Sequence, residues 1–212
     1  VGVTVSVNSK PAIQSTESPL ENVGVSLASG TYNNDISVRL THPTDGVEIF
    51  YSLDGSPPSI EYAGPVSISA NSTLRSRAKK EGHPDSDILE TVYSFKVATP
   101  TASIPAGSYP VSQTVTLGTA TTSAVIHYTI DGSTPTCTST TGTVTLGQSL
   151  ILKALACREN YETSDLLEIS YIAQPKLSTP IASPAGGTYD NDKTVTLSAV
   201  ESGASIYYSI DG

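Results

Sequence analysis

The stretch VEIFYSLDG at residues 47–55 recurs as AVIHYTIDG at residues 124–132 and as ASIYYSIDG at residues 204–212. In each copy the first, third, fifth and seventh residues are apolar or aromatic, which is the pattern of a β-strand with one buried face. The Asp-Gly pair that follows is typical of a tight turn. The chain is therefore predicted to contain the same strand and turn three times.

A second motif defines the length of the repeat. Gly-[Thr/Ser]-Tyr motifs end at Tyr32, Tyr109 and Tyr189. In every copy the tyrosine precedes the glycine of the Asp-Gly pair by 23 positions (55 − 32, 132 − 109 and 212 − 189). Successive tyrosines are 77 and 80 positions apart (109 − 32 and 189 − 109). Constant spacing within a unit and variable spacing between units indicate linked copies of one fold.

The organisation that follows is an all-β chain of tandem β-sandwiches. About six or seven short alternating segments per complete copy, separated by turn residues, favour two packed sheets. No window shows the apolar period of an amphipathic helix. We expect an N-terminal strand and linker at residues 1–22, sandwich repeats at 23–97 and 98–174, and a partial third repeat at 175–212. Both ends are interpreted as cut from a longer array.

Composition and charge exclude several kinds of partner. The formal net charge is −9, with 20 acidic against 11 basic residues, which argues against binding nucleic acid. No apolar run approaches the roughly 20 residues that span a bilayer, so we expect no membrane insertion within this chain. The sequence has neither a starting Met nor a basic-then-apolar leader, and it is interpreted as a mature or excised fragment.

The combined motifs G-[TS]-Y, V-x-L, I-x-Y-[TS]-x-D-G-S-x-P and L-[RK]-[SA]-x-A have a familiar pattern. They resemble the repeat at the C-terminus of chitobiases and β-hexosaminidases, and related fibronectin-type-III-associated modules of bacterial surface proteins. The resemblance covers about residues 23–212. It implies tandem immunoglobulin- or fibronectin-III-like β-sandwiches that serve as accessory domains, because hydrolysis in that family belongs to a separate barrel. We therefore expect no enzymatic activity and no cofactor.

The two cysteines, Cys137 and Cys157, both lie in the second copy, and both are missing from the first, where Ile60 and Lys79 take their places. Their joint absence favours a disulfide, which would contribute roughly 3 kcal/mol by closing a loop of this length. Two free buried thiols or a metal pair are the alternatives. A disulfide would indicate an oxidising compartment, so we expect an extracellular or cell-surface location.

Acidic residues recur at turns, where two interpretations compete. Asp54, Asp131 and Asp211 could be calcium or sugar ligands, or could close turns by bonding their own backbone. One carboxylate per repeat is far below the six to eight oxygens that calcium prefers, so turns are favoured and no metal is predicted. The loops 33–35 (Asn-Asn-Asp) and 190–192 (Asp-Asn-Asp) pose the same choice and receive the same interpretation.

Most of the 11 tyrosines occupy repeated strand positions, which favours half-buried packing with a bonded hydroxyl. Tyr62, Tyr161 and Tyr207 break this pattern and are candidates for exposed glycan contacts. Catalysis has no support, since the three histidines are scattered and no G-x-S-x-G motif occurs.

The favoured function is a non-catalytic structural spacer of an extracellular or cell-surface protein. Proline-containing linkers at residues 96–105 and 174–184 would limit bending between repeats. One alternative is a subunit of an extracellular filament, joined to other copies of itself by strand addition. Another is a carbohydrate-binding accessory module whose partner is a polysaccharide. Neighbouring repeats are the expected partners in the favoured case.

Overall fold

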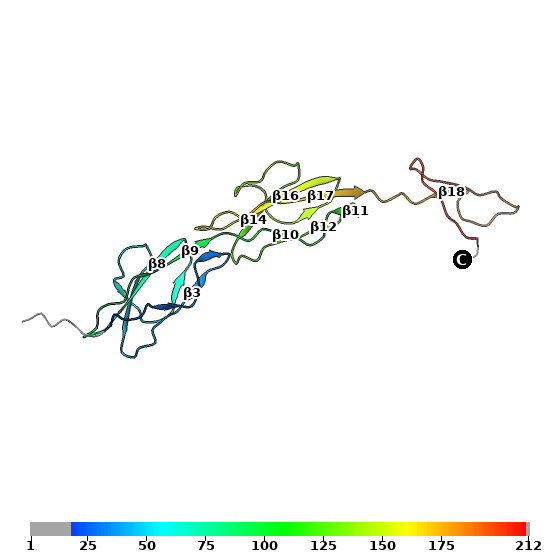
Figure 1. Ribbon diagram of the computed structural model, residues 1–212. Helices are drawn as coiled ribbons and strands as arrows, with labels where there is room; N and C mark the ends of the chain where they lie inside the picture. Colours follow the sequence, from blue (N-terminus) through cyan, green and yellow to red (C-terminus); the bar gives the residue numbers. More distant parts are fainter. Residues whose placement is uncertain (1–17, 211–212) are drawn as a thin grey trace, which may run out of the picture.

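The computed structural model describes residues 18–210, and this part of the chain contains strands and no helix. The predicted all-β fold is confirmed. The predicted strand at Val1–Val7 lies outside the described residues. Two sandwiches lie end to end, and a short strand pair lies beyond them after a segment without regular structure (Figure 1).

Repeat 1 is built from nine strands in two layers. Five of them form the sheet β2-β9-β8-β5-β6, in which only β2 and β9 run parallel. The facing layer consists of the antiparallel pairs β1–β4 and β3–β7. The strands are β1 (Gly24–Val25), β2 (Gly30–Tyr32), β3 (Ile36–Val38), β4 (Leu40–Thr41), β5 (Glu48–Ser52), β6 (Ile60–Glu61), β7 (Val66–Ile68), β8 (Ser72–Lys79) and β9 (Leu89–Phe95).

Repeat 2 has the same topology with one edge strand fewer. Its larger sheet is ordered β11-β17-β16-β14, again with one parallel pair at the edge, and it faces the pairs β10–β13 and β12–β15. The strands are β10 (Thr101–Ala102), β11 (Gly107–Pro110), β12 (Thr114–Val115), β13 (Leu117–Gly118), β14 (Val125–Thr129), β15 (Val144–Thr145), β16 (Leu150–Cys157) and β17 (Leu167–Gln174).

The repeated valines and tyrosines hold the two layers together. Val38 and Val115, the first residues of the V-x-L motif, are fully buried. Six of the repeated tyrosines donate hydrogen bonds from their hydroxyls to backbone carbonyls, and the five in repeats 1 and 2 also pack as predicted. These bonds join Tyr32 to Ala28, Tyr93 to Leu27, Tyr109 to Pro105, Tyr128 to Thr143, Tyr171 to Ile104 and Tyr189 to Ala185. In repeat 3 Tyr189 and Tyr208 are 43% and 76% exposed, so the packing prediction is wrong there.

In the described part of repeat 3, up to residue 210, the strands are β18 (Ile181–Ser183) and β19 (Thr196–Ser198), which pair antiparallel. The strand predicted from the stretch at residues 204–210 is not formed, and that prediction is wrong. The corresponding strand of repeat 1, β5, pairs with β8, and that of repeat 2, β14, pairs with β16. Within the described residues 175–210 no counterpart of β8 is formed, so the backbone at 204–210 has no partner there for a ladder.

Candidate functional site: the junction of repeats 1 and 2

The apolar core of repeat 1 continues into repeat 2. Phe95, at the end of β9, lies with its ring centroid 5.0 Å from that of Tyr161, which belongs to the loop between β16 and β17. Tyr161 and Ala156 of repeat 2 belong to the same buried cluster as the core of repeat 1. Burying an aromatic pair of this kind contributes beyond the area removed from water. The two sandwiches therefore share apolar packing.

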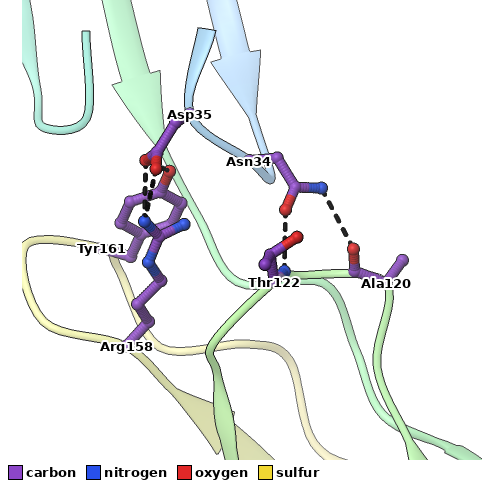
Figure 2. A network of polar contacts seen from close by, with 6 residues as sticks. All are labelled: Asn34, Asp35, Ala120, Thr122, Arg158 and Tyr161. Atoms are coloured by element: carbon purple, nitrogen blue, oxygen red, sulfur yellow. Dashed lines mark hydrogen bonds and ion pairs between the residues drawn. The ribbon is translucent and has the colours of Figure 1, made fainter.

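Tyr161 of this aromatic pair also takes part in a charged contact (Figure 2). Asp35, in the loop after β2, accepts hydrogen bonds from Nη2 of Arg158 through both carboxylate oxygens, at 2.8 and 2.7 Å. The hydroxyl of Tyr161 donates to Oδ1 of Asp35 at 2.7 Å. The guanidinium carbon of Arg158 also lies 4.3 Å from the ring centroid of Tyr161, within cation–π range. Arg158 and Tyr161 thus both donate hydrogen bonds to the carboxylate of Asp35.

Asn34 forms a second contact beside it. Its Oδ1 accepts the backbone N–H of Thr122 at 2.8 Å, and its Nδ2 donates to the carbonyl of Ala120 at 3.0 Å. One amide therefore bonds a donor and an acceptor of the same loop in repeat 2. Because both bonds use a single side chain, the loop of repeat 1 can dock in only one register.

The linker between the repeats is bonded along its backbone. Val97 N–H donates to the carbonyl of Glu162, and Glu162 N–H donates to the carbonyl of Phe95, both at 2.9 Å. Next along the chain, the backbone N–H of Ala98 donates to Oγ1 of Thr121 at 2.8 Å. Val97 is only 2% exposed, although it lies between two domains. This segment is a structural part of the junction rather than a free tether.

The junction shifts the titration of its own groups. The hydrogen bonds from Arg158, and next from Tyr161, hold the pKa of Asp35 below its ordinary value. Burial, assisted by the bond to Asp35, raises the pKa of Tyr161 to about 12. The hydrogen bond that Lys96 donates to Asp165, at 2.7 Å across the junction, raises the pKa of Lys96. Each shift favours the protonation state that the contacts require.

The repeats match a known family profile. The profile of the chitobiase/beta-hexosaminidase C-terminal domain matches residues 27–90, 104–168 and 184–212. The chain belongs to this family. The first two matched segments end within β9 and β17, and the loops that form the junction, 33–35 and 158–161, lie inside them.

Comparison with solved structures finds multi-domain β proteins at low identity. One is the Clostridium thermocellum CbhA fibronectin(III)-like modules, with 12% identity, 73% of this chain and 95% of that chain covered, and a TM-score of 0.26. Another is Drosophila OTK extracellular domains 3–5, with 11% identity, 89% and 78% covered, and a TM-score of 0.30. A third is the S-layer protein SbsC, domains 7, 8 and 9, with 13% identity, 75% and 62% covered, and a TM-score of 0.30. No curated protein matches the sequence.

Asp54 and Asp131, the first residues of the two Asp-Gly-Ser motifs, close turns. Oδ1 of Asp54 accepts the N–H of Ser56 at 3.0 Å, and Oδ1 of Asp131 accepts that of Ser133 at 3.0 Å. The intervening glycines have φ of 76° and 82°, as such turns require. Hydrogen bonds from the two serines lower the pKa of both carboxyls. Asp211 lies outside the described residues.

Within residues 18–210, no three His, Cys, Asp or Glu side chains gather closely enough to hold a metal ion. That part of the chain also contains no helix able to cross a membrane.

Cys137 and Cys157 form the disulfide that the sequence favours. It ties the loop after β14 to the end of β16. His127 of β14 is buried, and its Nδ1 lies 2.8 Å from the carbonyl oxygen of Ser139 in the same loop. The disulfide and this bond therefore close one end of the sheet of repeat 2.

The tyrosines proposed as glycan contacts separate into three cases. Tyr161 is only 9% exposed, so the expectation that it forms an exposed contact is wrong, and the reason is its packing against Phe95. Tyr62 is half-buried and packs edge-on against Tyr51 at 6.5 Å. Tyr207 is 92% exposed, and its role as a glycan contact stays a prediction.

Sequence reasoning missed the junction. The sequence assigns Asp35 to a turn or a calcium site, but its partner Arg158 lies 123 positions away and no local spacing connects them. The usable signal was a difference between copies. The second copy has Pro-Val-Ser at residues 110–112 where the first has Asn-Asn-Asp, which indicates a role that only some copies share.

Proposed function

We propose that this chain is a non-catalytic spacer of an extracellular protein, in which repeats 1 and 2 act as one rigid rod. The observation that carries this proposal is the bonded linker, with Val97 buried and its N–H paired to Glu162. Domains joined by a free linker move relative to one another by default. Here a rotation about the linker would expose the Phe95–Tyr161 pair and break the bonds to Asn34 and Asp35.

The extracellular part of the proposal rests on the disulfide. A bond between Cys137 and Cys157 forms and persists in oxidising compartments. The formal net charge of −9 also favours a well-solvated surface that resists nonspecific association. Both features suit a module that keeps other domains apart outside the cell.

The spacer function is tested by a distance distribution across the junction. Spin labels would be placed at the exposed residues Glu61 and Gln148 as a non-natural amino acid, because the two cysteines are paired. We expect one narrow distance peak. The double variant Asn34→Ala, Arg158→Ala should broaden it, because both docking loops lose their contacts.

The matched control is Glu90→Ala, which removes an ion pair to Arg75 at 2.8 Å inside repeat 1 and leaves the junction intact. This variant should keep the narrow peak. A broad distribution in the unaltered chain would reject the spacer function.

Self-assembly by strand addition is the second candidate, and one observation favours it. In repeat 3 the side chains of Val195, Tyr208 and Ile210 are 54%, 76% and 95% exposed. The counterparts of Val195, which are Val38 and Val115, are fully buried, and those of Tyr208, which are Tyr51 and Tyr128, are half-buried. Exposed apolar side chains of this kind can be covered by strands from another chain.

Solution mass over a range of protein concentrations tests this candidate. Assembly predicts a mass that rises with concentration and a smaller rise after Tyr208→Ser with Ile210→Ser. A constant mass of about the 22.0 kDa of one chain would reject assembly and leave the spacer function untouched.

A further inference from the structure

Repeat 3 carries the residues of the docking loop of repeat 1 after the same tyrosine, although no strand equivalent to β2 forms within its described residues. Asn191 and Asp192 follow Tyr189 by two and three positions, just as Asn34 and Asp35 follow Tyr32. The hydroxyl of each tyrosine donates to the carbonyl four residues earlier, and the bends after the two tyrosines fall at matching positions. The two loops are therefore anchored in the same way.

Repeat 2 lacks this loop. Its Val111 and Ser112 stand in place of the asparagine and aspartate. Their backbone N–H groups donate to Gln174 and Leu146 inside repeat 2. Neither side chain can offer a carboxylate to a guanidinium or an amide to a facing loop. The presence of the loop is thus a property of individual repeats and not of the fold.

The loop of repeat 3 makes no side-chain contact of this kind within the described residues. Asn191 and Asp192 are exposed, and no described residue bonds to either side chain. In repeat 1 the equivalent pair is bonded to Thr122, Arg158 and Tyr161. The loop of repeat 3 therefore has the residues and the tyrosine bond of a loop that docks in repeat 1.

We propose that Asn191 and Asp192 bind a sandwich repeat that follows repeat 3 in tandem and carries an Arg-x-x-Tyr loop like that of residues 158–161. The guanidinium and phenol of that loop would bond the carboxylate of Asp192, as Arg158 and Tyr161 bond Asp35. This inference rests on the spacer function, because it extends the rigid junction to a second place in the array.

Neither repeat 1 nor repeat 2 of a second copy of this chain can supply the required Arg-x-x-Tyr loop. In repeat 1, Lys80 and His83 take the places of Arg158 and Tyr161, and Lys80 donates to the carbonyl of Asp45. An ammonium is a point charge and lacks the planar fork that a carboxylate pairs with. In repeat 2 the Arg-x-x-Tyr loop is already occupied by Asp35. A second copy of this chain therefore offers no free partner loop.

An extended chain tests the proposal directly. In this chain a second copy of residues 54–174 would be joined after Ile210. Its Asp54-Gly55 pair takes the place of the Asp-Gly pair of repeat 3, and the residues up to 97 complete that repeat. Residues 98–174 then form a second repeat 2 directly after it. Trypsin cleavage at Lys96 of the added segment reports opening of the new junction. We expect Asp192→Ala to raise its rate by about tenfold, because a charge-assisted contact is lost.

The matched control is Asp190→Ala, whose counterpart Asn33 makes no bond across the junction in repeat 1. It should leave the cleavage rate unchanged. Equal rates for the two variants would overturn the proposal. Protection that depends on protein concentration would mean that another chain occupies the loop, and would also overturn a tandem partner.

A substitution in the natural chain covers the case in which the hybrid repeat does not fold. Asn33→Asp converts the loop of repeat 1 into that of repeat 3, and Lys96 should stay protected. Asn34→Val with Asp35→Ser introduces the residues of repeat 2 and should raise the cleavage rate at Lys96. Loss of protection in Asn33→Asp would reject the loop as a docking site. If the unaltered chain has no protection at Lys96, the spacer function itself fails.

Discussion

At the residue scale, Asp35 concentrates the polar contacts of the junction. It accepts three hydrogen bonds from Arg158 and Tyr161, although its side chain is still 52% exposed. Solvent screening keeps the net gain from such a pair modest. Nη1 of Arg158 is buried and has no partner among the described residues. The pair therefore contributes orientation more than stability, and most of the binding free energy comes from Phe95 and Tyr161.

Substitutions of Tyr161 separate these two contributions. Tyr161→Ala should lower the free energy of unfolding by about 3 kcal/mol, because it removes a buried ring and leaves a cavity beside Phe95. Tyr161→Phe should cost only about 1 kcal/mol, the loss of one hydrogen bond to a half-exposed carboxylate. Urea unfolding measures both. Equal costs for the two variants would contradict an apolar origin of the coupling.

The pH range of the junction follows from its pKa shifts. The pKa of Asp35 is lowered from 3.8, so its stabilisation is present above that value and is lost as pH falls through the lowered pKa. The pKa of Tyr161 is raised from 10.0 to about 12, so its stabilisation is complete below pH 10 and is lost between these values. Amide chemical shifts of the linker should be constant between these limits. Asp35→Asn should remove the acid transition.

At the scale of elements, the two linkers of the chain have opposite environments. Residues 96–100 contact both repeats, and Val97 and Pro100 are buried. Residues 174–183 are exposed throughout. Phe95, which packs on Tyr161, corresponds to Ala173 in the second repeat. Both linkers contain the prolines expected to stiffen them. Proline content therefore does not distinguish a linker that is bonded to its repeats from one that is exposed.

Limited trypsin digestion should register this difference. We expect fast cleavage after Lys176, where the following Leu177 is 57% exposed, and slow cleavage after Lys96, where the following Val97 is buried. Peptide mass spectrometry gives both rates from one sample. Arg158→Ala should raise the rate at Lys96 and leave that at Lys176 unchanged. Similar rates at the two lysines in the unaltered chain would contradict a bonded linker.

The strands were predictable and the junction was not, for one physical reason. Strands such as β5 follow from period-2 alternation, and turns such as Asp54-Gly55 follow from local backbone chemistry, so both depend on neighbours in sequence. The contact between Asp35 and Arg158 depends on how two finished domains meet. The strand predicted at residues 204–210 failed for the same reason, because its ladder requires a distant partner.

At the scale of the whole molecule, the sandwiches lie end to end with their shared contacts confined to one narrow junction (Figure 1). Rigidity of the pair thus depends on few residues, which lie in the loops at residues 33–35, 119–122 and 158–165 and in the linker at 96–100. The same family domain can then form a fixed or an exposed connection according to its loop residues. An array of such repeats would combine rods and hinges without any change of fold.

The rigid junction is tested most directly by ¹⁵N relaxation of backbone amides across the full chain. We expect the amides of residues 23–97 and 98–174 to fit a single anisotropic diffusion tensor, as one elongated body. Asn34→Ala with Arg158→Ala should separate them into two faster-tumbling domains. If the unaltered chain already requires a separate, shorter correlation time for each repeat, the two sandwiches are not one rigid rod.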